Sequence, residues 1–107
     1  MMNDDLPDWV VSCFRVALLG EIYPSIRAVA VKYEISGELL IRYYLDREPS
    51  DFDRESIEVV ATNFDATSPQ NSLHKIDVEC VFYDGPANRM DALDGFVYAR
   101  REYEMEN

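Results

Sequence analysis

The chain has 107 residues, and its 21 acidic side chains against 10 basic ones give it a formal net charge of −11. This length predicts a single domain over residues 1–107, with flexible ends at about 1–6 and 104–107. Hydrophobic residues make up 48% of the chain and aromatic residues 12%, which excludes an acidic disordered segment. The negative charge argues against nucleic acid or an anionic membrane as a partner, because both attract basic surfaces.

The two cysteines and the N-terminus indicate a cellular compartment. Cys13 and Cys80 each lie in an apolar stretch, where a free cysteine behaves as a small buried hydrophobe. A single disulfide between them is one alternative, but two cysteines do not make a disulfide scaffold. The N-terminus lacks the basic region of a secretory signal, and the apolar-rich stretch Trp9 to Leu19 is shorter than the roughly 20 residues that span a bilayer. We therefore expect a reducing, cytoplasmic location.

The first half of the chain predicts a helix followed by a β-hairpin. Apolar side chains recur at helical spacing from Asp8 to about Glu21. Tyr23-Pro24 ends this helix, because proline disfavours the α conformation in the residue before it. The segments Ile26 to Ile35 and Leu39 to Leu45 are rich in strand-forming residues, and Ser36-Gly37 between them suits a hairpin turn.

The second strand of this hairpin has two unlike faces. Residues at alternating positions of a strand point to opposite sides of the sheet. One set is wholly apolar, and the other mixes polar with apolar side chains. The mixed set is Leu40, Arg42, Tyr44 and Asp46. We expect its face to be the wetter of the two.

A second amphipathic helix is predicted after Pro49. Ser50 suits the N-cap position, and Asp51 and Asp53 in the first turn complement the helix dipole. Apolar side chains then recur on one face. They are Ile57, Val60, Ala61 and Phe64. A different face carries an acidic outer stripe. Its members are Glu55, Glu58, Thr62 and Asp65.

The second half of the chain predicts two more strands. Leu73 to Tyr83 alternates between apolar and charged residues, which is typical of a half-buried strand, and His74 lies near its start on the apolar face. Met90 to Leu93 suits a helical turn. Phe96 to Tyr103 suits a last strand, and a helix over the same residues is the alternative. The order is α-β-β-α-β-β. It predicts an α+β fold, a two-layer sandwich in which two helices cover an antiparallel sheet of about four strands.

The sequence lacks the common motifs of catalysis and of cofactor binding. It contains no phosphate-binding glycine loop, no zinc-ligand spacing and no serine nucleophile motif, so we predict no cofactor, no metal and no catalytic residue. The only histidine, His74, and Cys80 lie about 20 Å apart along one strand, too far for a nucleophile and its base. Acidic pairs will arise by chance among 21 carboxylates, and a small two-layer domain rarely holds the deep cleft of a carboxylate hydrolase.

The distribution of negative charge points to a candidate surface. Residues 36–65 carry eight acidic and three basic side chains. The densest run comprises Asp46, Glu48, Asp51, Asp53, Glu55 and Glu58. This run is either a solvated helix face or a docking surface for a basic protein, where charge accelerates association. Tyr44, on the same predicted face as Asp46, is the best aromatic anchor for such a surface. The acidic tail, by contrast, reads as a solvated terminus. It comprises Glu102, Glu104 and Glu106.

Three stretches of the chain together resemble a known family. They are Ala17 to Pro24 with Ile26 to Ala30, Arg42 to Pro49, and Leu93 to Glu102. The chain is similar, from about residue 14 to residue 103, to small immunity proteins of bacterial contact-dependent growth inhibition and related polymorphic toxin systems. None of the stretches is a catalytic signature, and no site residues transfer from the family.

The resemblance implies a cytoplasmic antidote that binds the C-terminal toxin domain of a delivered protein, commonly by covering its active site. Many such toxins are nucleases, often acting on tRNA, and their basic substrate clefts would attract a chain of charge −11. We therefore expect a non-enzymatic inhibitor of a basic toxin. The alternatives are an acidic adaptor that regulates another basic protein and a small carboxylate-dependent hydrolase.

Overall fold

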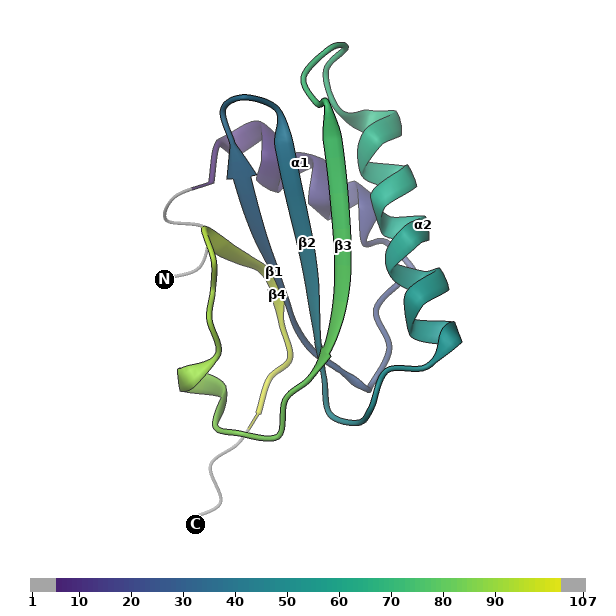
Figure 1. Ribbon diagram of the computed structural model, residues 1–107, viewed down its shortest axis with the longest axis vertical. Helices are drawn as coiled ribbons and strands as arrows, with labels where there is room; N and C mark the ends of the chain where they lie inside the picture. Colours follow the sequence, from purple (N-terminus) through teal and green to yellow (C-terminus); the bar gives the residue numbers. More distant parts are fainter. Residues whose placement is uncertain (1–5, 103–107) are drawn as a thin grey trace.

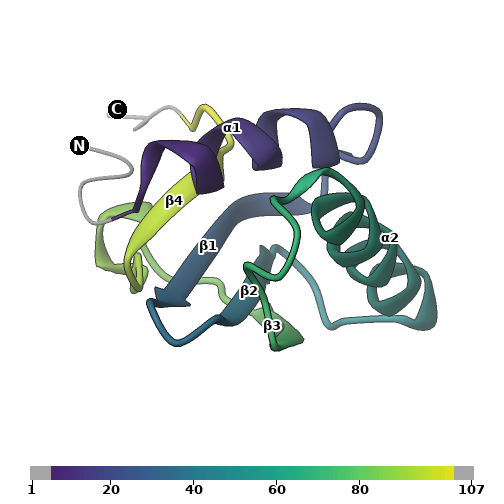
Figure 2. The ribbon, with the colours of Figure 1, turned by 90° about the horizontal axis from the view of Figure 1, so that it is seen from above.

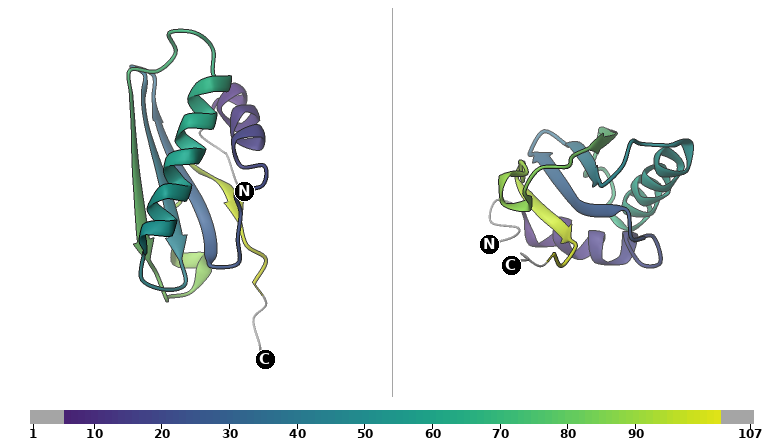
Figure 3. Two further views of the ribbon diagram at one scale, coloured as in Figure 1. Left: turned by 90° about the vertical axis from the view of Figure 1, so that its right-hand side faces the viewer. Right: turned by 90° about the horizontal axis from the view of Figure 1, so that it is seen from below.

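The computed structural model describes residues 6–102 and contains two helices, four strands and one short 3-10 helix. In chain order these are α1 (Asp8–Ala17), β1 (Ile26–Glu34), β2 (Glu38–Leu45), α2 (Asp51–Thr67), β3 (Lys75–Phe82), η1 (Ala87–Arg89) and β4 (Gly95–Ala99). The strands form a single sheet in the order β3-β2-β1-β4 (Figure 1). Both helices lie on the same side of this sheet (Figure 3). The predicted α+β fold and its element order are therefore confirmed.

The sheet is antiparallel except for one pair of strands. β1 pairs antiparallel with both β2 and β4, whereas β2 and β3 are parallel in unbroken register from Glu38–Lys75 to Leu45–Phe82. The predicted antiparallel sheet is confirmed for the other strand pairs, and the parallel pairing of β2 with β3 is the exception. The reason is the connection between them. α2 follows β2 in the chain and returns it along the sheet, so that β3 starts at the same end as β2, as in a β-α-β unit.

The main core lies between the two helices and the sheet. The α1 residue Phe14 and the α2 residue Phe64 are fully buried, and their ring centroids lie 4.4 Å apart. From the sheet, Val29 and Tyr43 point into the same core and are inaccessible to solvent. Seen from above, α1 and α2 lie next to each other over the strands (Figure 2). Burial of this shared apolar face holds the helices against the sheet.

Local sequence signals set the ends of the helices. α2 begins at Asp51 after the N-cap Ser50, as predicted. α1, in contrast, ends at Ala17, four residues before the predicted end at Glu21. Gly20 adopts a φ of +76°, a left-handed conformation that glycine accepts readily and that does not continue a right-handed helix.

The segments near the two ends of the chain differ in part from expectation. The helical turn lies at Ala87–Arg89 and not at 90–93, because Pro86 precedes it and suits the start of a helix. β4 is a strand, which removes the helical alternative, and it ends at Ala99. Leu6, placed in the flexible N-terminal end, is instead buried in the core. The other predicted end residues, 1–5 and 104–107, and Tyr103 lie outside the described range.

The second face of the sheet is also covered. Ala28, Ala30 and Tyr44 form a smaller buried cluster with partly buried side chains from the segment between β3 and β4, among them Met90 and Leu93. This face is still the wetter of the two, as expected, because Leu40, Arg42 and Asp46 keep some exposure to solvent, whereas Tyr44 is only 4% exposed. Because β3 and β4 are the two edge strands, the chain that joins them has to cross the sheet, and it crosses on this face.

Candidate functional site

The acidic run from Asp46 to Glu58 contains two kinds of carboxylate. Asp46 and Asp53 each pair with an arginine that holds the fold together. Asp53 is buried, and Asp46 is exposed but held by Arg100. The other four acids of the run are also exposed, and they lie in the segment before α2 and in its first half. They are Glu48, Asp51, Glu55 and Glu58. The structure therefore narrows the candidate docking surface to these four side chains, which we call the acidic rim.

Asp53 is completely buried, although it lies in the first turn of a surface helix. Its carboxylate accepts hydrogen bonds from Arg47 Nη1 at 2.6 Å, Tyr23 Oη at 2.5 Å and the backbone N–H of Ser50 at 2.7 Å. Burial alone would raise the pKa of Asp53, but the bonds from Arg47, Tyr23 and Ser50 outweigh it and hold this pKa well below its usual range. Asp53 thus stays ionised and anchors the start of α2.

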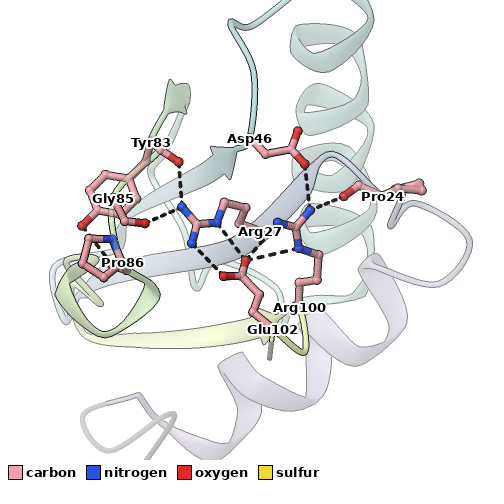
Figure 4. A network of polar contacts seen from close by, with 8 residues as sticks. All are labelled: Pro24, Arg27, Asp46, Tyr83, Gly85, Pro86, Arg100 and Glu102. Atoms are coloured by element: carbon pink, nitrogen blue, oxygen red, sulfur yellow. Dashed lines mark hydrogen bonds and ion pairs between the residues drawn. The ribbon is translucent and has the colours of Figure 1, made fainter. Parts of the chain in front are cut away.

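Asp46 belongs to a network that fixes the end of the described chain (Figure 4). Arg100 Nη1 lies 2.8 Å from Asp46 Oδ2, and Arg100 Nη2 lies 3.0 Å from Glu102 Oε2. Glu102 also binds Arg27, whose Nη2 and Nε lie 2.7 and 2.8 Å from its two oxygens. The prediction that Glu102 belongs to a solvated tail is wrong, because two arginines hold it against β1; Glu104 and Glu106 lie outside the described residues.

Arg27 is the central residue of this network and is only 8% exposed. Besides Glu102, its Nη1 donates to the carbonyl oxygens of Tyr83 and Gly85, each at 2.8 Å. The side chain thereby joins β1 to the loop after β3 and to the segment after β4. A planar guanidinium with five N–H donors can satisfy three separate acceptor groups in this way.

Tyr44 does not lie at the surface beside the acidic rim. Its ring packs edge-on against Tyr83, with centroids 5.7 Å apart, and its hydroxyl donates to the carbonyl oxygen of Asp91 at 2.9 Å. The side chain therefore fastens the segment before β4 to the sheet and is not displayed to a partner.

A different aromatic pair lies next to the acidic rim. Tyr23, before β1, and Phe52, in the first turn of α2, pack edge-on with centroids 5.1 Å apart. They line a groove of about 320 Å³ between the segment that follows α1 and the first half of α2. Glu55 and Val59 of α2 also line it. Sequence reasoning missed this groove, although an aromatic residue between two aspartates at a helix start, Phe52, was a signal for it.

The remaining candidates for chemistry are separated from one another. His74 is exposed and precedes β3, contrary to its predicted place on the apolar face, and it lines a polar hollow of about 430 Å³ with Glu58 and Asp65. Cys13 and Cys80 are free thiols that pack against the main core, and burial raises the pKa of Cys80 to about 11. Within residues 6–102, no group of three or more histidine, cysteine or acidic residues could hold a metal ion.

Two comparisons with known proteins bear on this surface. A family model described as "MafI2 immunity protein" matches residues 7–102, which is nearly the whole chain. No curated protein matches the sequence. In the part of the chain that the structure describes, no helix is long and apolar enough to cross a membrane.

Proposed function

The chain belongs to the MafI2 immunity protein family, and from this premise we propose that it neutralises a cognate nuclease toxin by covering the toxin's basic substrate surface. The family supports toxin neutralisation as the function. The nature of the toxin and the mode of inhibition are our proposal. In it the protein acts in the cytoplasm as a stoichiometric, non-enzymatic inhibitor.

The acidic rim is the observation that carries this proposal. Its four carboxylates are exposed; three lie on the capped first half of α2, and Glu48 lies in the segment just before it. Among the described residues, only Asp51 of the four has an ion-pair partner, Arg54 at 3.2 Å, and both side chains of that pair are exposed. Unpaired exposed carboxylates on a chain of charge −11 favour encounter with a basic surface and hold it in register.

The other three predicted contact residues have structural roles. Asp53 fixes the start of α2, Asp46 fixes the end of the described chain, and Tyr44 fixes the loop before β4. The hydrolase alternative gains no support from Glu55 and Glu58, which line different grooves.

Co-expression and binding kinetics test the proposal. The protein should rescue cells that express the toxin domain encoded beside it, and the purified pair should form a complex in which nuclease activity is lost. The double variant Glu55→Lys/Glu58→Lys should associate more slowly at low salt and show a weaker dependence of the association rate on ionic strength. If the protein rescues cells from a toxin that has no nuclease activity, only the proposal that the toxin is a nuclease is refuted.

A matched double variant controls for total charge. Glu34→Lys/Glu38→Lys makes the same four-unit change at the tip of the β1–β2 hairpin, where both side chains are exposed. It should change the association rate less than the α2 variant does. Equal slowing by both variants would show that net charge, and not the acidic rim, controls binding.

A further inference from the structure

The groove beside Tyr23 and Phe52 is built from two sequence-distant segments. The chain between α1 and β1 contributes Glu21, Ile22 and Tyr23, and α2 contributes Phe52, Glu55 and Val59. At about 320 Å³ it has room for one long side chain but not for a helix. It opens directly onto the acidic rim, since Glu55 belongs to both.

The walls of the groove expose apolar side chains that the fold does not use. Phe52 is 62% exposed and Val59 is 43% exposed. Leu19, which is 73% exposed, immediately precedes Gly20, another lining residue. Exposed aromatic and aliphatic groups gathered at one groove are typical of an interaction site, whereas singly scattered ones are not.

The charged side chains that line the groove are all acidic. Glu21 and Glu55 line it, and no lysine, arginine or histidine does. Among residues 6–102, neither of these glutamates has an ion-pair partner. The groove therefore joins an apolar, partly aromatic wall to two carboxylates that lack a cation.

The groove is preformed, because buried contacts fix the residues that line it. The hydroxyl of Tyr23 donates to Asp53, and Asp53 also binds Arg47 and the N-cap of α2. These contacts fix the Tyr23 ring and the first turn of α2, which carries Phe52. A preformed site lowers the ordering cost that binding would otherwise incur.

From these observations we infer that the groove receives one arginine or lysine side chain of the toxin, a specificity that rests on the proposed function. The aliphatic stem would pack on Val59 and Ile22, and the cationic head would lie near Phe52 and between Glu21 and Glu55. Long basic side chains bury their stems on apolar surface in this way. A cation near an aromatic face gains further attraction, which a purely apolar occupant does not.

The test compares binding of the catalytically inactive toxin domain to single variants of the full-length protein. Val59→Arg places a cation inside the groove and should raise the Kd at least about tenfold, as loss of an interface anchor does. Ile35→Arg adds the same charge to a position that is 97% exposed at the tip of the β1–β2 hairpin, outside the groove and outside the acidic rim. It should stay within about threefold of the unmodified protein, as peripheral changes do.

Two further variants decide whether the occupant is charged. Glu55→Gln and Glu21→Gln should each raise the Kd and reduce its salt dependence, and Phe52→Ala should raise the Kd at every salt concentration. Since all these side chains are at least partly exposed, the variants should keep the circular dichroism spectrum and melting temperature of the parent.

The outcomes separate this inference from the proposed function. If the unmodified protein does not bind the toxin, both are refuted. If it binds, and Val59→Arg binds equally well, the groove is not the anchor site, whereas the proposed function stands. If Val59→Arg and Phe52→Ala weaken binding but the two glutamine variants do not, the occupant is an uncharged apolar side chain and the cationic anchor is refuted.

Discussion

The Tyr23 hydroxyl lies 2.5 Å from Oδ1 of Asp53, and through this bond the segment before β1 is fastened to the first turn of α2. Arg47 binds the same carboxylate through two nitrogens, at 2.6 and 3.1 Å. One buried aspartate therefore joins the segment before β1 to the residues just before and at the start of α2. The acidic rim and the neighbouring groove both depend on the geometry it sets.

Replacing this aspartate should destabilise the fold strongly. Asp53→Asn removes the negative charge that Arg47 and Tyr23 bind and weakens the cap of α2, and we expect a loss of about 2–3 kcal/mol in the free energy of unfolding. Asp51→Asn, two positions earlier in the same turn and fully exposed, should cost no more than about 0.5 kcal/mol. Urea denaturation of both variants measures the difference, and equal costs would contradict this role of Asp53.

The contribution of Asp53 should depend on pH in the acid range. Its pKa is held below the usual value in the folded protein, so the unfolded chain takes up the proton first as the pH falls. The stabilisation is therefore complete above the unfolded pKa of about 3.9 and is lost progressively below it. The stability gap between the parent and Asp53→Asn should be constant from pH 6 to 8 and shrink below about pH 4. A stability gap that widens in acid would contradict the lowered pKa of Asp53 in the folded protein.

Arg27 should be irreplaceable by lysine. Arg27→Lys keeps the charge but cannot reach Glu102 and the carbonyls of Tyr83 and Gly85 together, and we expect a loss of about 2 kcal/mol. Hydrogen exchange should also accelerate in β4 and the residues after it, because Glu102 loses one of its two arginines. Arg54→Lys, at an exposed helix position, should leave both stability and exchange nearly unchanged. Similar exchange in both variants would contradict the network in Figure 4.

Tyr44 should matter for stability and not for toxin binding. Tyr44→Phe leaves the carbonyl of Asp91 without its buried donor, at a cost of about 1 kcal/mol. Tyr33→Phe is the matched control, because the Tyr33 hydroxyl forms no hydrogen bond with another residue of the described range. Calorimetric titration with the toxin should give the same Kd for the parent and for Tyr44→Phe. A weaker complex at unchanged stability would restore Tyr44 as a contact residue.

Local sequence patterns were sufficient to predict most of the fold. Helical spacing and Ser50 placed α2, alternation placed β3, and Ser36-Gly37 placed the hairpin turn, because each of these signals acts through the backbone of a few neighbouring residues. The parallel pairing of β3 with β2 was missed, although the predicted strand–helix–strand order is itself a signal for a β-α-β unit. Which strand β3 pairs with is decided by tertiary packing, because the pairing is between residues that are distant in sequence.

The acidic composition, by itself, determined that a basic partner is the one to expect and located the densest acidic run. Only the tertiary structure decided which of those acids are available. Asp46 and Asp53 pair with arginines that lie 54 and six positions away. Asp53 is fully buried, whereas the Asp46–Arg100 pair stays partly exposed. The charge of −11 is thus a property of the sequence. The four exposed carboxylates and the groove beside them arise because folding brings distant side chains together and removes some charges from the surface.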